Sequence, residues 1–142
     1  MSDEKMMNLI NEALDAFNSH DVDKFINFYA KDALHYQPTQ PEPLKGRTAI
    51  KEDYMNLTFN AFPDVFFEKE NIFYQNEWVC VEGIFKGTHK GPLLDQEKGE
   101  ISPTNKYVEV PICFVIKIKN SKIKEVHEYN DQLEFLTQLE LV

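Results

Sequence analysis

Residues 106–119 constrain the fold of this 142-residue chain more than any other stretch. Apolar side chains take every second position in it: Val108, Val110, Ile112, Phe114, Ile116 and Ile118. Alternation over this length predicts a long β-strand with one face in a hydrophobic core. A turn at residues 120–121 and a second strand over residues 122–130 follow. The C-terminal third of the chain therefore predicts an antiparallel hairpin.

Polar side chains gather on one predicted face of the returning strand. Regular alternation places Ile123, Glu125, His127, Tyr129 and Asp131 on that face. Two carboxylates, an imidazole and a phenol are unusual beside so apolar a partner strand. We therefore expect the functional site on this face.

Three N-terminal helices are expected from apolar residues at helical spacing. The first covers residues 6–17, and the second begins at Asp21, a predicted N-cap. The apolar stripe of this second helix includes Tyr29 and extends to Ala30. The third helix follows Gly46 and ends at Pro63, since the residue before a proline disfavours helical backbone.

The rest of the chain predicts strands, one long loop and a closing helix. Strands are expected over residues 34–37, 64–74 and 77–89. Residues 90–105 are polar and rich in glycine and proline, which predicts a mobile loop that could act as a flap. The closing helix, residues 131–141, is expected to turn Leu133, Leu136 and Leu139 inward.

This order of elements favours the α+β class in one domain over residues 1–142, because the strands are grouped after the helices. We expect a curved antiparallel sheet that forms a cone, with three N-terminal helices and a C-terminal helix. The open mouth of such a cone is a natural pocket for a small molecule.

Charge and composition exclude several classes of partner. A net charge of −9 argues against nucleic acid and against an anionic membrane surface, because both need clustered Lys and Arg. No apolar stretch approaches the roughly 18 residues of a membrane span, and the N-terminus lacks the pattern of a signal peptide. Cys80 and Cys113 have no metal-type spacing, which is typical of reduced thiols in a cytoplasmic protein.

Short segments in a particular order carry a family resemblance. They are AFPD at 61–64, GTHKG at 87–91, PTN at 103–105, KIKE at 122–125, Asp131, and QLEL at 138–141. Together they make the chain resemble the SnoaL-like polyketide cyclases of the nuclear transport factor two-like (cystatin-like) superfamily. The resemblance implies a cone-shaped α+β fold, commonly dimeric, with an apolar pocket and no metal or organic cofactor. It also implies that Asp131 is the acid/base carboxylate.

Two residues have both a catalytic and a structural interpretation. Asp131 opens the sequence DQLE, which also fits a capping box, in which its carboxylate would bind free amides of the closing helix. His89 ends a predicted strand, so it could bind a substrate carbonyl or carry a proton, or be a turn histidine bonded to backbone. Both interpretations stay open for each residue.

Several aromatic residues are expected to line the pocket as substrate-binding residues: Tyr29, Tyr36, Tyr54, Trp78, His127 and Tyr129. The alternative is that aromatic residues at core spacing only fill the core. A metal site is not expected, since four strand residues between His127 and Asp131 span ~13 Å.

Two functions follow from these observations. One is a cofactor-independent cyclase or isomerase, in which a carboxylate removes a proton next to the carbonyl of an apolar substrate. The other is a module of the same fold that binds an apolar ligand, or dimerises, without catalysis. In either case we expect a homodimer, because one face of the sheet surrounds the pocket and the other must be covered.

Overall fold

The computed structural model describes residues 2–95 and 98–142, and its elements follow the expected order with additions. In chain order they are α1 (Asp3–Asn18), α2 (Val22–Asn27), β1 (Tyr29–Tyr36), β2 (Leu44–Lys45), α3 (Arg47–Tyr54), the π-helical turn η1 (Met55–Phe59), β3 (Phe66–Gln75), β4 (Trp78–Thr88), β5 (Leu93–Asp95), β6 (Gly99–Ile101), β7 (Tyr107–Lys119), β8 (Lys122–Asn130) and α4 (Gln132–Gln138). None of the described helices is long and apolar enough to cross a membrane.

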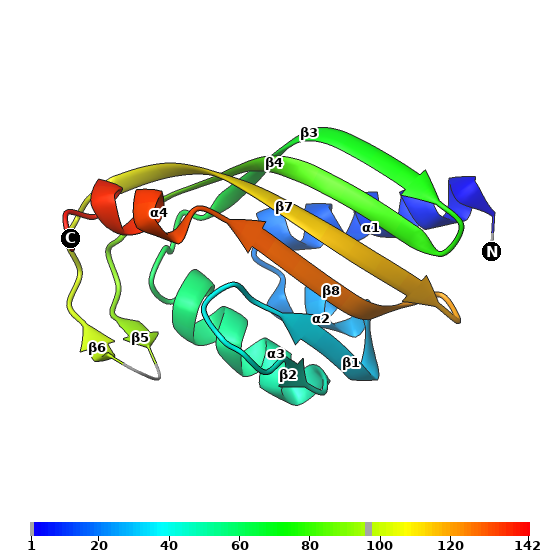
Figure 1. Ribbon diagram of the computed structural model, residues 1–142, viewed down its shortest axis with the longest axis horizontal. Helices are drawn as coiled ribbons and strands as arrows, with labels where there is room; N and C mark the ends of the chain where they lie inside the picture. The colour runs from blue at the N-terminus through cyan, green and yellow to red at the C-terminus, as the bar shows by residue number, and fades with distance from the viewer. Residues whose placement is uncertain (1, 96–97) are drawn as a thin grey trace.

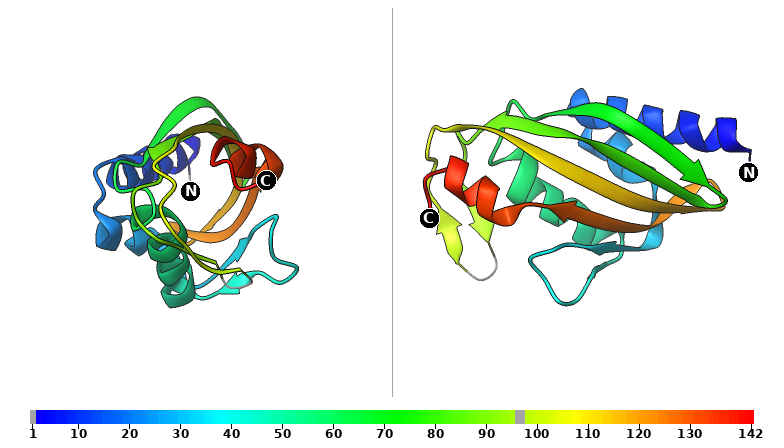
Figure 2. Two further views of the ribbon diagram at one scale, coloured as in Figure 1. Left: turned by 90° about the vertical axis from the view of Figure 1, so that its left-hand side faces the viewer. Right: turned by 45° about the horizontal axis from the view of Figure 1, so that its top comes forward.

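One curved sheet organises the molecule, in the strand order β2-β1-β8-β7-β4-β3. Neighbouring strands are antiparallel except β1 and β8, which are parallel. The sheet curls over α1, α2 and α3, while α4 and the β5–β6 hairpin lie at one end (Figures 1 and 2). The α+β cone expected from the sequence is confirmed.

The core lies between the concave face of the sheet and the first three helices. Strand β7 turns Val108, Val110, Ile116 and Ile118 inward, as its alternation predicts, and all four are buried. Helix α1 contributes a buried stripe that includes Met6, Ile10, Ala13 and Phe17. Burial of one such side chain stabilises the fold by ~1.5–3 kcal/mol.

The second helix is shorter than its apolar stripe predicts. It ends at Asn27, and Tyr29 begins β1 instead of continuing the helix. The amide of Ile123 donates to the carbonyl of Phe28 at 2.8 Å, and Tyr29 then pairs with Ile123 in the parallel ladder. Pairing with a distant strand therefore overrides the local helical pattern.

The predicted face of the returning strand is wrong, because β8 contains a bulge. Lys117 pairs with Glu125 and the next residue, Ile118, pairs with Ile123, so Lys124 is an extra residue. One extra residue shifts the alternation of every later side chain to the other face of the sheet. The pocket face of β8 therefore carries Val126, Glu128 and Asn130 in place of His127 and Tyr129.

The last two segments also differ from expectation. In α4, Leu139 is buried at the helix end, but Leu133 is 67% exposed and Phe135 packs against the core in its place. The segment expected to be a loop contains the β5–β6 hairpin. It is tied to the body through Gly91, whose amide donates to the carbonyl of Ala61 at 3.1 Å.

Candidate functional site

A cavity of about 180 Å³ opens between the concave face of the sheet and α1–α3. Most of its wall is apolar, and the aromatic part consists of Phe17, Phe25, Tyr29, Tyr54, Phe67, Phe85, Phe114 and Phe135. Its rim includes Pro38 and Thr39 after β1, and Leu93 and Asp95 on the hairpin. An enclosed apolar space with a few polar groups is the usual form of a small-molecule site.

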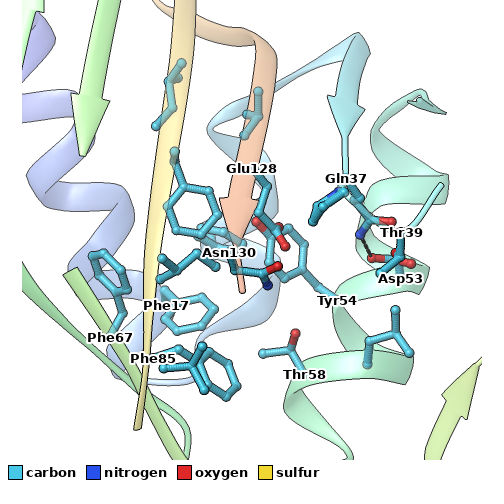
Figure 3. Close-up of a pocket in the computed structure, with 18 of the residues that line it drawn as sticks. Phe17, Gln37, Thr39, Asp53, Tyr54, Thr58, Phe67, Phe85, Glu128 and Asn130 are labelled. Atoms are coloured by element: carbon cyan, nitrogen blue, oxygen red, sulfur yellow. Dashed lines mark hydrogen bonds between the residues drawn. The ribbon is translucent and has the colours of Figure 1, made fainter. Parts of the chain in front are cut away.

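The first polar group in this wall is the carboxyl of Asp53, which α3 turns inward beside Tyr54. Its Oδ2 accepts a hydrogen bond from Nε2 of Gln37 at 2.6 Å (Figure 3). Burial raises the pKa of Asp53, because a charged carboxylate is poorly solvated there. The bond from Gln37 and the nearby His35 oppose that rise, whereas the negative charge of Glu128 adds to it.

The second carboxyl, that of Glu128, enters the cavity from β8 on the opposite wall. Figure 3 shows it directed into the same space as Tyr54 and Asp53 of α3. Its Oε1 lies 3.1 Å from Nε2 of His35, and the two side chains are 17% and 1% exposed. Parallel pairing of β1 with β8 brings this histidine beside the glutamate.

His35 itself lies behind the cavity wall. Its ring meets Tyr54 edge-on, with centroids 5.7 Å apart, and its Nδ1 has no hydrogen-bond partner among the described residues. The imidazole can therefore hold Glu128 in place from behind and leave the carboxylate facing the cavity.

Two tyrosines complete the polar group. The hydroxyls of Tyr29 and Tyr54 are 3.1 Å apart and form one hydrogen bond. Burial is the main reason that the pKa of each phenol is raised, so both stay protonated over the physiological range. One hydroxyl hydrogen of the pair remains free to donate to a ligand.

The polar amide of Asn130 also lines the cavity, two residues beyond Glu128 on the same face of β8. Its Oδ1 is buried and accepts no hydrogen bond within the described part of the chain. A buried acceptor without a partner is costly, so a ligand donor placed here would be favoured.

Of the residues expected to bind substrate, Tyr29 and Tyr54 lie in the cavity wall, and their role stays a prediction. The others are found on the outer face of the sheet. Tyr36 stacks on His127 with ring centroids 4.4 Å apart, and Trp78 lies 6.1 Å from the same histidine. Tyr129 is 57% exposed. The expectation that these four line the pocket is wrong. The bulge turns His127 and Tyr129 outward, and Tyr36 and Trp78 pair with residues of that outer face, His127 and Lys117.

The two residues expected to be catalytic also lie outside the described lining of the cavity. Asp131 is the exposed N-cap of α4, and its Oδ1 accepts from the amide of Glu134 at 3.0 Å. His89 is fully buried, and its Nδ1 accepts from the amide of Thr104 at 3.1 Å. Burial lowers the pKa of His89, which favours a neutral structural imidazole.

The sequence reasoning missed His35, Gln37, Asp53, Glu128 and Asn130. One signal was available for the two residues of β8. Ile123 and Val126 are apolar residues three apart in a predicted strand, a spacing that regular alternation does not allow and a bulge does. The other three depend on contacts between β1 and α3 that no local pattern predicts.

Comparison with known proteins identifies the family of this chain. Residues 8–139 match the family model described as SnoaL-like polyketide cyclase. The chain belongs to this family. No curated protein matches the sequence.

Solved structures share the fold of this SnoaL-like chain at low sequence identity. A candidate SnoaL-like polyketide cyclase from Jannaschia sp. CCS1 is 17% identical, with a TM-score of 0.86 over 100% of this chain and 97% of its own. AclR, a candidate hydroxylase from Streptomyces galilaeus, is 20% identical, with a TM-score of 0.78 over 99% and 88%. IdmH, a candidate polyketide cyclase from Streptomyces antibioticus, is 21% identical, with a TM-score of 0.74 over 94% and 97%.

Proposed function

We propose that this SnoaL-like protein binds a small apolar ring compound and moves a proton at the carbon next to its carbonyl group. Cyclisation and isomerisation reactions of such compounds share this step. The observation that carries the proposal is the pair of carboxyl groups, Asp53 and Glu128, in one otherwise apolar cavity. Two carboxyls in different surroundings are a recurrent arrangement for acid/base chemistry.

The two carboxyls have different roles in this proposal. Glu128, held by His35, is the proton acceptor, because its carboxylate faces the cavity. Asp53 has a raised pKa, so it is the group better suited to share a proton with the carbonyl oxygen as negative charge develops there. The free hydroxyl hydrogen of the Tyr29–Tyr54 pair is a second donor for that oxygen.

The acid/base role of Asp131 is less well supported. Its carboxylate already binds an amide of α4, and it lies outside the described lining of the cavity. The same holds for His89, which is buried against the segment that precedes β7. We therefore assign the chemistry to Asp53 and Glu128.

The test is proton exchange in deuterium oxide with β-tetralone, a compact ketone with acidic protons next to its carbonyl. We expect the protein to speed exchange at that carbon, followed by NMR. Glu128→Gln and Asp53→Asn keep shape but remove the ionisable group, and each should slow exchange by ~100-fold or more. Glu125→Gln is the matched control, because it removes the same charge from the outer face of the same strand.

A second function, ligand binding without catalysis, has one observation in its favour. Both carboxylates already have a protein partner, Gln37 for Asp53 and His35 for Glu128. Binding of β-tetralone without any acceleration of exchange would favour this function. Exchange that is unchanged in both Glu128→Gln and Asp53→Asn would contradict the catalytic assignment.

We further infer that residues 1–142 form one domain that acts as a homodimer in the cytoplasm. Support for the dimer comes from exposed aromatic side chains on the outer face of the sheet, among them Phe73 and Tyr129. Support for the compartment comes from Cys80 and Cys113, which are free although their sulfurs are only 3.5 Å apart.

A further inference from the structure

Apart from the tyrosines, the ionisable side chains that line the described part of the cavity are all carboxyls. They are Asp53 on α3, Glu128 on β8 and, at the rim, Asp95 on β5. Within residues 2–95 and 98–142, no Lys, Arg or His belongs to this wall. An anionic ligand would find no positive partner there and would meet carboxylates at close range. Repulsion of this kind is strong in a partly enclosed, poorly solvated space.

Two acceptors without full protein partners lie close together on β8. Glu128 presents carboxyl oxygens to the cavity, and Asn130 presents a buried Oδ1 without a partner among the described residues. A ligand with N–H groups placed beside them would satisfy both.

Aromatic rings surround this acceptor group. Phe17, Phe25, Tyr29 and Tyr54 all line the cavity, and the rings of Phe25 and Tyr54 meet at 5.0 Å and 88°. Aromatic faces attract a desolvated cation. Carboxylates and aromatic rings together are the chemistry that recognises a protonated amine.

The volume limits the size of the ligand. About 180 Å³ is close to the ~150 Å³ of an engineered apolar cavity that accepts one benzene molecule. One ring fits inside, and a second can extend toward the rim at Pro38 and Leu93. A long chain of fused rings would not fit this space.

We propose that the cavity selects a compact ring compound that carries a protonated nitrogen, and that it rejects the anionic analogue. This inference rests on the proposed function, because it assigns the substrate class of the same site. A positive charge on the substrate would stabilise an enolate next to it, in a wall whose described residues supply no cation. Glu128 and Asn130 hold the ammonium group in this arrangement.

The experiment uses three ligands with one skeleton: β-tetralone, its analogue with an ammonium group in place of the ketone, and its analogue with a carboxylate. Affinities are measured by calorimetry on the full chain at neutral pH. We expect the ammonium compound to bind at least ~10-fold more tightly than the ketone, since a charge-assisted hydrogen bond adds ~1.5–3 kcal/mol. The carboxylate should bind more weakly than either.

Two variants separate the pocket charge from the net charge. Glu128→Gln should remove most of the preference for the ammonium compound over the ketone. Glu125→Gln changes the net charge equally but lies on the outer face, so the preference should stay. Melting temperatures of both variants establish that they are folded.

The possible outcomes distinguish this inference from the proposed function. Equal binding of the ammonium and carboxylate compounds, or equal effects of Glu128→Gln and Glu125→Gln, would overturn the inference. Proton exchange on β-tetralone that depends on Asp53 and Glu128 would still support the proposed function in that case. Conversely, a clear preference for the ammonium compound with no exchange would support this inference and contradict catalysis.

Discussion

Asp53 and Glu128 show how the surroundings of a residue decide its chemistry. Both are carboxyl groups in one cavity, but Asp53 is bound by the neutral amide of Gln37 and Glu128 by the imidazole of His35. Asp131, by contrast, has the local sequence of a helix cap and is one in the structure. Its carboxylate binds an amide of α4 and not the cavity.

Substitution of Asp131 is therefore expected to affect stability and not proton exchange. Asp131→Asn should cost only a few tenths of a kcal/mol, because Asp and Asn are about equally good N-caps. Asp131→Ala should cost ~1 kcal/mol in urea unfolding. A ~100-fold loss of exchange in Asp131→Asn with an unchanged melting temperature would return the acid/base role to Asp131.

At the scale of the element, one extra residue in β8 decides which side chains reach the cavity. Ile123 faces inward before the bulge and Val126 after it, so two buried positions lie three residues apart. Glu128 follows on the same face, two residues later. If the same residues paired in regular register, without a bulge, His127 would face the cavity and Glu128 would face outward.

Deletion of Lys124 tests this account. With Lys124 removed, Glu125 alone lies between Ile123 and Val126, so regular alternation without a bulge keeps Val126 and Glu128 on the cavity face. We therefore expect the deletion variant to fold and to bind β-tetralone within a few-fold of the unmodified protein. Lys124→Ala is the control, since it removes only the ion pair with Asp32 and keeps the bulge. That exposed pair is worth ~0.2–1 kcal/mol, so urea unfolding should show a similar loss in both variants. Binding that is lost in the deletion variant but kept in Lys124→Ala would contradict us.

At the scale of the whole molecule, the curved sheet has two faces with different environments. Its concave face meets α1–α3 (Figure 2) and surrounds the cavity. Its outer face carries exposed aromatic side chains. Phe73 and Tyr129, 59% and 57% exposed, lie on this outer face. Large apolar groups are enriched where two proteins meet.

We predict a homodimer that uses this outer face. Light scattering at micromolar concentration should give twice the chain mass. The double variant Phe73→Lys and Tyr129→Lys should shift the mass to that of one chain without loss of helical signal. Leu94→Lys, which places a lysine at an exposed apolar residue of the β5–β6 hairpin, should remain dimeric. A monomer for the unmodified protein would contradict the prediction.

The amino-acid sequence by itself determined those helices and strands whose pattern of apolar residues fits only one arrangement. The alternation in β7 could only be a long strand with that apolar face inward, because a shift of one residue would expose the whole set. The stripe of α1 and the cap at Asp131 are likewise local, since each depends on residues three or four apart. The family resemblance then predicted that the sheet curves into a cone.

Only the tertiary structure decided the composition of the site. His35, Asp53 and Glu128 are distant in sequence, and they meet because β1 pairs in parallel with β8 while α3 packs beside it. The short α2 follows from the pairing of β1 with β8, and the bulge at Lys124 follows from the pairing of β7 with β8. Both ladders supply backbone hydrogen bonds that local preference cannot outweigh. Contacts across the sheet therefore place side chains at an irregular register, and they place Glu128 beside His35 in the wall of the cavity.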